Sequence, residues 1–382
     1  MFFKWDTLWQ DGFPDEEFDY MVSNPTYGKK WGTIKAKVQK ANNSRFDAGY
    51  PGTGDGQLLF TLHMVSKMKA VESGGSAIAI VHNGSPLFKG GAGSGESEIR
   101  RHLIENDWLE TVVALPTNLF YNTGIATYIW IVRNNKKGKR VGKIQLINGV
   151  DYWEKMQRSL GDKRKRINDK QIAEIIQLHK QFKETEFSKI YDKDDFAFRK
   201  VFLELEEQDE NGLPLYDTKL VNISAKDLRD NVLINFKSKE EKATLKKILD
   251  KKDTEETYYE LALIPNSDFI KKYKTPDGTI KLHRYFVGKS LKLQTTIRIP
   301  KTSKDDEIIP WKEDRDIFLK REVEKPYKIL REEKGYEIPF TREFYKYQPL
   351  PKLEEVVEKF AELEGDNQRI LSQLGIDLYE RV

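Results

Sequence analysis

Four consecutive residues, Asn24-Pro25-Thr26-Tyr27, combine groups that could hold a planar ring by an amino group. They follow the apolar run 18–23, which is typical of a strand. Pro25 fixes φ and has no N–H for a sheet ladder, so the strand must end there. The corner presents an amide side chain, backbone carbonyls and an aromatic ring. Since ligands of open α/β sheets bind outside the carboxyl ends of strands, this corner is a candidate binding site.

The elements around this corner follow an α/β pattern over residues 1–150. Hydrophobic periodicity predicts strands that alternate with helices, which indicates a sheet covered by helices. The expected strands are 18–23, 76–81, 109–115, 126–132 and 141–147, and the expected helices are 57–69 and 97–106. The last two strands flank the basic segment Lys136-Lys137-Gly138-Lys139-Arg140 and are predicted to form a hairpin with this basic tip.

Three further regions complete the predicted organisation. Residues 151–200 are expected to continue the first domain as a helical segment, in which Asn168 or Asp169 caps a helix. Residues 201–320 are rich in Lys and Glu and broken by prolines, so we expect an irregular charged insertion or linker. Residues 321–382 are expected to be helical. One apolar stripe there, which favours packing on a core or on a partner helix, comprises Leu353, Val356, Val357, Phe360 and Leu363.

Composition excludes several classes of site. The 382 residues include no cysteine, so disulfides, thiol nucleophiles and cysteine-ligated metals are excluded, and the five histidines lack metal-ligand spacing. No apolar run is long enough to span a membrane, and the N-terminus lacks the features of a signal peptide, so we expect a cytoplasmic protein without a membrane partner. The net charge of +4 is too balanced to diagnose nucleic-acid binding. Two local basic clusters, 136–140 and 163–166, are more informative.

Further motifs lie in a fixed order along the chain. They are Phe18-Asp19-Tyr20, the 24–28 corner, Gly52-Thr53-Gly54-Asp55-Gly56-Gln57 with the apolar 58–60, the segments 83–88, 93–100 and 115–125, and Gly335-Tyr336-Glu337-Ile338-Pro339-Phe340-Thr341. In types and order these blocks resemble the modification subunit of type I restriction-modification systems, which is an adenine-N6 DNA methyltransferase. The resemblance covers most of the chain. It implies a Rossmann-like methyltransferase sheet, of which the C-terminal half is present, with a mostly helical C-terminal extension.

The resemblance also implies roles for the corner. Adenine N6 is a poor nucleophile because its lone pair is delocalised into the ring. The Asn24 side-chain oxygen and the Pro25 carbonyl would accept its two hydrogens, and Tyr27 would stack on the flipped base. S-adenosyl-L-methionine would be the methyl donor, and no metal is required. The implied partners are double-stranded DNA, a specificity subunit that chooses the target site and a restriction subunit.

Other residues are candidates for the base pocket, for DNA contact or for a structural role. Thr26, Phe120 and Tyr121 are candidates for the base pocket, although at least one of the two aromatics is expected in the core. Lys136, Lys137, Lys139 and Arg140 are candidates for DNA phosphate contact, with a solvated turn as the equal alternative. His82 is expected to be structural, because the methylated nitrogen can lose its proton to water. The glycines at 90–95 favour a flexible, DNA-facing loop over a phosphate site.

Two features depart from the family pattern. Thr26 stands where the family usually has a second proline, which reduces preorganisation but keeps the amide, carbonyl and aromatic groups. Only 23 residues precede Asn24, whereas the family's donor-binding half, with its glycine-rich turn, lies before this motif. Asp6 resembles an aspartate near the end of that half that lies close to the donor adenine. We therefore expect a C-terminal portion that is incomplete for catalysis. The rival hypothesis is a non-catalytic assembly or DNA-binding remnant.

Overall fold

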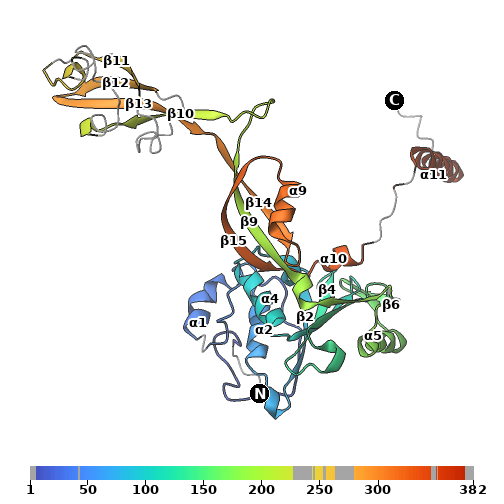
Figure 1. The fold of residues 1–382 in the computed structure, drawn as a ribbon. Coiled ribbons are helices and arrows are strands. Elements are labelled where there is room, and N and C mark those ends of the chain that lie inside the picture. The colour runs from blue at the N-terminus through green and yellow to red at the C-terminus, as the bar shows by residue number, and fades with distance from the viewer. Residues whose placement is uncertain are drawn as a thin grey trace.

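The computed structural model describes residues 6–41, 44–226, 243, 246–252, 255–262, 279–345, 350 and 352–374. They form a mixed α/β body, an arm of antiparallel strands and a C-terminal helix that lies apart from the body (Figure 1). The candidate corner belongs to the body.

A six-stranded mixed sheet forms the centre of the body, with the strand order β1-β2-β4-β3-β5-β8. β1 pairs in parallel with β2, and β3 in parallel with β5, whereas β4 and β8 run in the opposite direction. The strands are β1 (Tyr20–Ser23), β2 (Ala77–Asn83), β3 (Leu109–Leu115), β4 (Thr127–Arg133), β5 (Lys143–Asn148) and β8 (Ser188–Asp192). The predicted strands are therefore present within a few residues of their expected bounds.

The predicted hairpin between residues 126–132 and 141–147 is wrong. Both edges of β4 are occupied, one by β2 and the other by β3, and β5 pairs with the far edge of β3. The basic tip therefore crosses the amino end of β3 rather than joining two neighbouring strands. Sequence proximity favours a hairpin, but β4 is a largely buried central strand whose apolar side chains need neighbours on both edges.

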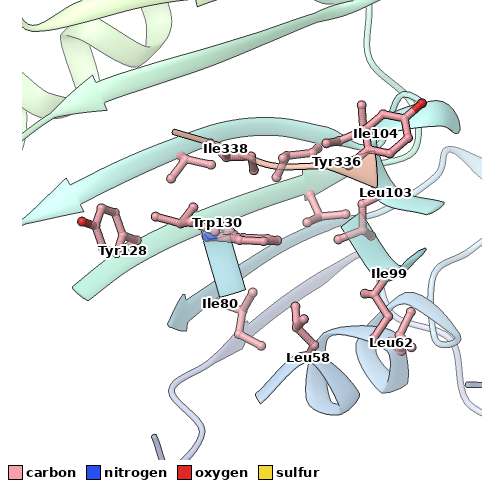
Figure 2. Close-up of a cluster of buried hydrophobic side chains, with 14 of the residues drawn as sticks. Leu58, Leu62, Ile80, Ile99, Leu103, Ile104, Tyr128, Trp130, Tyr336 and Ile338 are labelled. Atoms are coloured by element: carbon pink, nitrogen blue, oxygen red, sulfur yellow. The ribbon is translucent and has the colours of Figure 1, made fainter. Parts of the chain in front are cut away.

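Helices and the returning chain cover the two faces of this sheet. On β3, Val112 and Ala114 join the main core cluster, whereas Val113 and Leu115 join a second cluster with α5, because successive strand residues point to opposite faces. Figure 2 shows the main core, where α2 and α4 meet Ile80 of β2 and Trp130 of β4. The helices of the body are α1 (Lys35–Lys40), α2 (Gln57–Val65), α3 (Ser85–Phe88), α4 (Gly95–Glu105) and α5 (Asp169–Gln181), with 3-10 turns at η1 (Gly32–Ile34), η2 (Val71–Ser73), η3 (Gly138–Arg140) and η4 (Lys193–Phe196).

Residues 151–200 are only partly helical. Asn168 caps α5 as predicted, since its side chain accepts a hydrogen bond from Gln171 N and the Gln171 side chain accepts one from Asn168 N. Before α5, however, the chain forms an antiparallel hairpin of β6 (Glu154–Leu160) and β7 (Lys163–Arg166). The expectation of one helical segment missed this hairpin because its lysines and arginines lack a strand's apolar alternation.

The arm overturns the prediction of an irregular region over 201–320 and of a mostly helical extension. Its described residues form two antiparallel sheets, ordered β14-β9-β15 and β10-β13-β12-β11. Lys and Glu occupy outward positions of these strands. The high charged content of the segment therefore masked the alternation of apolar and polar residues that is typical of strands. The strands are β9 (Ala197–Glu206), β10 (Tyr216–Asn222), β11 (Thr257–Ala262), β12 (Thr279–Val287), β13 (Ser290–Pro300), β14 (Thr302–Pro310) and β15 (Tyr327–Tyr336), and the helices after residue 310 are α9 (Arg315–Glu322), α10 (Phe340–Glu343) and α11 (Leu353–Gln373).

The end of β15 brings the chain back into the core of the body. Tyr336 is fully buried, and its hydroxyl donates to Glu105 Oε1 at 2.6 Å. The buried Arg100 guanidinium of α4 donates to the carbonyls of Tyr336, Pro86, Lys89 and Gly90. A side chain at Gly335 would collide with the Phe198 ring, 2.3 Å from an added Cβ. The 335–341 block therefore completes the hydrophobic core beneath the arm.

The glycine-rich loop at 90–95 has a packing role. An added Cβ at Gly95 would lie 1.7 Å from the Tyr50 carbonyl oxygen, so only glycine permits this approach. Ser94 then caps α4 by accepting from Ser97 N at 3.2 Å. Close packing rather than flexibility accounts for Gly95.

Candidate functional site

The corner at Asn24-Pro25-Thr26-Tyr27, which we call the clamp, lies where β1 ends at the carboxyl edge of the sheet. Pro25 is buried, whereas Asn24 and Thr26 are exposed. The Tyr27 hydroxyl donates a 2.5 Å hydrogen bond to Asn24 Oδ1. Burial raises the pKa of Tyr27 to about 12, so the phenol stays protonated and remains a donor at neutral pH. The Asn24 side-chain oxygen, which is predicted to accept a hydrogen bond from the base, thus already accepts one from Tyr27.

The glycine-rich loop at 52–56 holds the chain that leaves the clamp. Trp31 N donates to Thr53 O at 3.0 Å, and the buried Trp31 indole donates to Gly52 O at 3.1 Å. Gly56 N donates to Lys29 O at 3.2 Å. These bonds fix the backbone of residues 29–31, which follow the clamp. The 52–56 block therefore has a structural role.

A second aromatic reaches the clamp from the loop after β3. The Phe120 and Tyr27 rings meet edge to face, with centroids 6.3 Å apart and planes at 74°. Phe120 also packs against the second core cluster, as expected for one of the two aromatics. The side chain of Tyr121 is 57% exposed and lies beneath Lys163, whose Nζ is 4.9 Å from its ring centroid. Phe120 is therefore adjacent to Tyr27, and Tyr121 points toward the β6–β7 hairpin.

A cavity of about 420 Å³ lies on the other side of the clamp. Its lining includes Thr7, Tyr20, Val22 and Pro25. Asp6 precedes this lining, and its carboxylate accepts from Leu8 N at 3.2 Å within a turn. Lys67 at the cavity is paired with Asp11 at 2.6 Å, and His63 contacts Arg45 at 3.0 Å. The cavity therefore offers an apolar wall, and these polar side chains are occupied.

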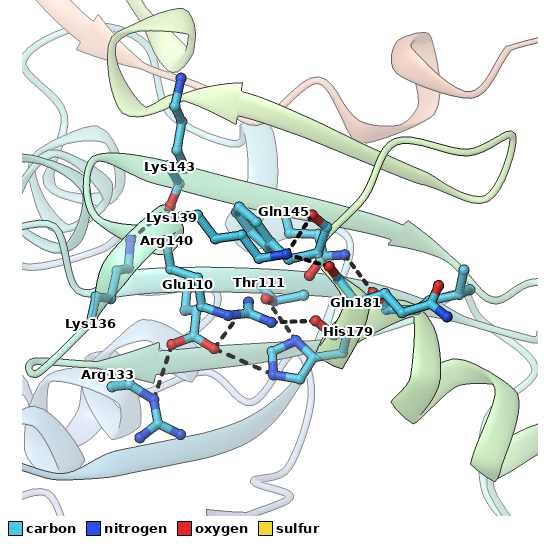
Figure 3. A network of polar contacts seen from close by, with 12 residues as sticks. Glu110, Thr111, Arg133, Lys136, Lys139, Arg140, Lys143, Gln145, His179 and Gln181 are labelled. Carbon is cyan, nitrogen blue, oxygen red and sulfur yellow. Dashed lines mark hydrogen bonds and ion pairs between the residues drawn. The ribbon is translucent and has the colours of Figure 1, made fainter.

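The basic tip does not form a free cationic patch (Figure 3). Lys136 Nζ binds Asp107 at 2.7 Å and the Lys143 carbonyl at 2.9 Å, and Lys139 donates to the carbonyl of Gln181 at 2.5 Å. Arg140 pairs with the buried Glu110 at 3.4 Å and donates to the His179 carbonyl. Lys137 is exposed.

The basic tip also lies at the wrong end of the sheet for contact beside the clamp. β4 runs antiparallel to β2, so Arg133 pairs with Ala77 at the amino end of β2. The clamp follows the carboxyl end of the parallel β1. Lys136, Lys139 and Arg140 bind groups of the protein itself, so the structure gives their expected phosphate contacts no support, and these contacts stay a prediction.

His82 is part of the core. Its Nε2 lies 2.8 Å from Thr61 Oγ1, and its ring packs edge-on against Trp130. Burial lowers the pKa of His82 to about 3, so it is neutral at physiological pH. These contacts join α2 to β2 and β4, which agrees with the structural interpretation.

Sequence reasoning gave no role to the second basic cluster at 163–166, which proves to be β7 of the exposed hairpin. The run of four consecutive basic residues was the only available signal. Among the described residues, no group of three or more His, Asp or Glu could hold a metal ion. The helices that the structure describes include none long and apolar enough to cross a membrane.

A mixed α/β sheet with an Asn-Pro-x-aromatic corner at a strand's carboxyl end defines a candidate nucleotide-base site. The chain belongs to the N-6 DNA Methylase family, which it matches over residues 2–214, more than half of its length. This family membership confirms the predicted resemblance to adenine-N6 DNA methyltransferases.

Individual relatives agree with the family. The chain is 28% identical over 254 residues to the MjaIX type I restriction enzyme methylase subunit of Methanocaldococcus jannaschii, covering 65% of this chain and 42% of that protein. It is 30% identical over 135 residues to the HindI methylase subunit of Haemophilus influenzae, covering 35% and 28%. The methyltransferase subunit structure from Streptococcus thermophilus matches with 24% identity and a TM-score of 0.42, covering 50% of this chain and 38% of that one. The chain spans less than half the length of these relatives.

Proposed function

We propose that this chain is the base-holding part of an adenine-N6 DNA methyltransferase of a type I restriction-modification system. The observation that carries the proposal is the clamp, whose exposed amide and half-buried aromatic stand together at the carboxyl edge of the sheet. The sheet is consistent with the Rossmann-like methyltransferase class. In this proposal a specificity subunit chooses the DNA site and a restriction subunit completes the system.

The chemistry follows from the acceptors of the clamp. An extruded adenine would bring its N6 amino group to Asn24 Oδ1 and to the Pro25 carbonyl, in place of the Tyr27 hydroxyl. Two acceptors on the N6 hydrogens favour a more tetrahedral and more nucleophilic nitrogen. Tyr27 would turn its ring onto the base, and stacking worth about 1–3 kcal/mol would offset part of the cost of extrusion.

The methyl donor of the family's reaction is S-adenosyl-L-methionine. The residues described beside the clamp fit it only in part: the cavity supplies an apolar wall, but Lys67 is engaged by Asp11 and the Asp6 carboxylate caps a turn. We therefore expect the chain alone to bind the donor weakly. Titration calorimetry checks this, and a micromolar dissociation constant would refute it.

The decisive experiment replaces Asn24. In a complex reconstituted with a donor-binding half and a specificity subunit, Asn24→Ala should lower methyl transfer by about 10²-fold or more, as for loss of a preorganised polar group. Duplex affinity should stay unchanged. Asn122→Ala, an exposed asparagine in the loop after β3, is the matched control. Equal transfer by Asn24→Ala and the parent would show that the base site is misassigned.

The apolar stripe of α11 supports a second, assembly role. Leu353, Val357 and Phe360 are each more than half exposed, so this face has no neighbour within the described chain. We propose that it docks a helix of the specificity subunit. Deleting residues 352–382 should weaken that association at least tenfold in a pull-down titration, and undiminished binding would remove this role.

A further inference from the structure

The β6–β7 hairpin concentrates the chain's positive charge. Residues 154–166 hold six basic and two acidic side chains, a net +4 that equals the net charge of the whole chain. Arg158 and Arg164 are exposed, and Lys163 and Lys165 are partly exposed. The base site proposed above makes no use of this hairpin.

Backbone hydrogen bonds fix the hairpin to the loop after β3. The amides of Arg164 and Lys165 donate to the Asn118 carbonyl at 3.0 and 3.2 Å, and Asp162 N donates to Tyr121 O at 3.0 Å. Asn118 adopts a left-handed conformation with φ 58°, which asparagine tolerates better than most residues. The hairpin is therefore held in a defined position.

The same loop carries Phe120, which meets Tyr27 of the clamp. The hairpin is thus one loop away from the base site, on the same carboxyl edge of the sheet. The basic tip, by contrast, crosses the amino end of β3.

The cations of the hairpin are presented on aromatic surfaces. Lys163 Nζ lies 4.9 Å from the Tyr121 centroid, and Lys165 Nζ lies 3.8 Å from the Trp153 centroid. An aromatic ring face attracts the lysine ammonium but accepts no strong hydrogen bond from it. The N–H donors of the ammonium therefore stay available for oxygen ligands. Arg166 differs, since it pairs with Glu154.

We propose that the β6–β7 hairpin binds the DNA sugar-phosphate backbone beside the adenine held in the clamp. This inference rests on the proposed function, and it identifies the hairpin as the protein surface that holds the DNA substrate. Lys163 binds phosphate from its place over the ring of Tyr121, the residue after Phe120, and the exposed Arg164, which follows Lys163 on β7, also binds phosphate. As positioning residues they keep the strand in place while one nucleotide is extruded, a step that costs a few kcal/mol.

The test measures the salt dependence of duplex binding by the full chain. Fluorescence anisotropy of a labelled duplex of mixed sequence is recorded at several salt concentrations for the parent and for Lys163→Gln/Arg164→Gln. Each phosphate contact contributes about 0.9 to the slope of log affinity against log salt, so the slope should fall by about 2. The control, Lys180→Gln/Lys183→Gln, removes two exposed charges outside the hairpin and should keep the parental slope.

Three results would overturn the proposal: an unchanged slope in the hairpin variant, an equal loss in the control, or no duplex binding by the parent. An unchanged slope would assign the hairpin to an acidic protein partner instead. Thermal melting verifies the fold of each variant. If Lys163→Gln/Arg164→Gln unfolds, the single variants Lys163→Gln and Arg164→Gln replace it, each with an expected decrease of about 0.9 in the slope.

The outcome is separable from that of the proposed function. Loss of transfer by Asn24→Ala with an unchanged slope in the hairpin variant keeps the base site and overturns the hairpin proposal. A reduced slope in the hairpin variant with full transfer by Asn24→Ala keeps the DNA surface and overturns the base site. In the reconstituted enzyme, the hairpin variant should raise KM for DNA at least tenfold and leave kcat within about threefold.

Discussion

Two basic clusters of similar composition lie on this protein, and they differ in what their charges contact. The basic tip, residues 136–140, crosses the amino end of β3, and Lys136, Lys139 and Arg140 bind carboxylates or carbonyls of the protein. The hairpin cluster, residues 163–166, lies near the clamp, with Lys163 and Lys165 over aromatic rings. The first cluster holds the fold together, whereas the second is available to a ligand.

Glu110 explains much of the difference. It is 2% exposed and faces Arg133, Arg140 and His179 at 3.0 to 3.4 Å. A buried carboxylate needs cationic partners, so Arg140 of the basic tip is used to compensate it, together with Arg133 of β4. The hairpin has no such buried carboxylate, and its acidic partner Glu154 lies at the surface with Arg166.

The largest expected effect comes from removing that carboxylate. Glu110→Gln leaves Arg133 and Arg140 without their counter-charge and should lower the free energy of unfolding by about 3 kcal/mol. Glu154→Gln, which breaks a surface pair, should leave the free energy of unfolding nearly unchanged. Urea unfolding followed by tryptophan fluorescence measures both. Equal losses would mean that the two clusters do not differ in this way.

Acid should weaken the body through its buried histidines. Burial lowers the pKa of His63 to about 4 and of His82 to about 3, and it also lowers the pKa of His179 beside Glu110. The unfolded state therefore binds protons first, so stability is complete above pH 6.5 and falls as the pH drops below it. His63 and His82 should each account for about 1 kcal/mol between pH 7.5 and 5.5. Urea midpoints that stay constant over this range would contradict the prediction.

Tyr27→Phe isolates the hydrogen bond inside the clamp. The variant frees Asn24 Oδ1 and keeps the ring, so it should cost about 1 kcal/mol of stability or less and change methyl transfer less than tenfold. Tyr27→Ala also removes the stacking surface and should reduce kcat/KM by a further 10-fold or more. Steady-state transfer assays in the reconstituted enzyme compare them. Equal activity of the two variants would exclude a stacking role.

The smallest effect on stability is expected for the hairpin variant Lys163→Gln/Arg164→Gln, which should have a large effect on DNA binding. Lys163→Gln/Arg164→Gln removes exposed charges and one surface cation–π contact, so its free energy of unfolding should change by less than about 1 kcal/mol. Lys136→Gln, at a side chain that is 2% exposed, should lose more. Thermal melts of both variants check this order.

Several features of the site follow from local chemistry and were predictable. Pro25 cannot donate to a ladder, so β1 ends at Ser23 whatever surrounds it. Asn168 caps α5 because its side chain reaches an amide three residues away. The packing of the 335–341 block on Arg100 of α4 was not foreseen, because the two segments are more than 200 residues apart in the sequence.

The sequence by itself determined the corner after β1, five of the six strands of the central sheet and the family, because these depend on patterns of neighbouring residues. Only the tertiary structure decided that β4 lies between β2 and β3, that charged ribbons form the arm, and which basic cluster is free. The physical reason is that a lysine's role depends on its partner. Glu110 and Asp107 reach the basic tip because β3 lies between β4 and β5, while the hairpin meets the aromatic rings of Tyr121 and Trp153.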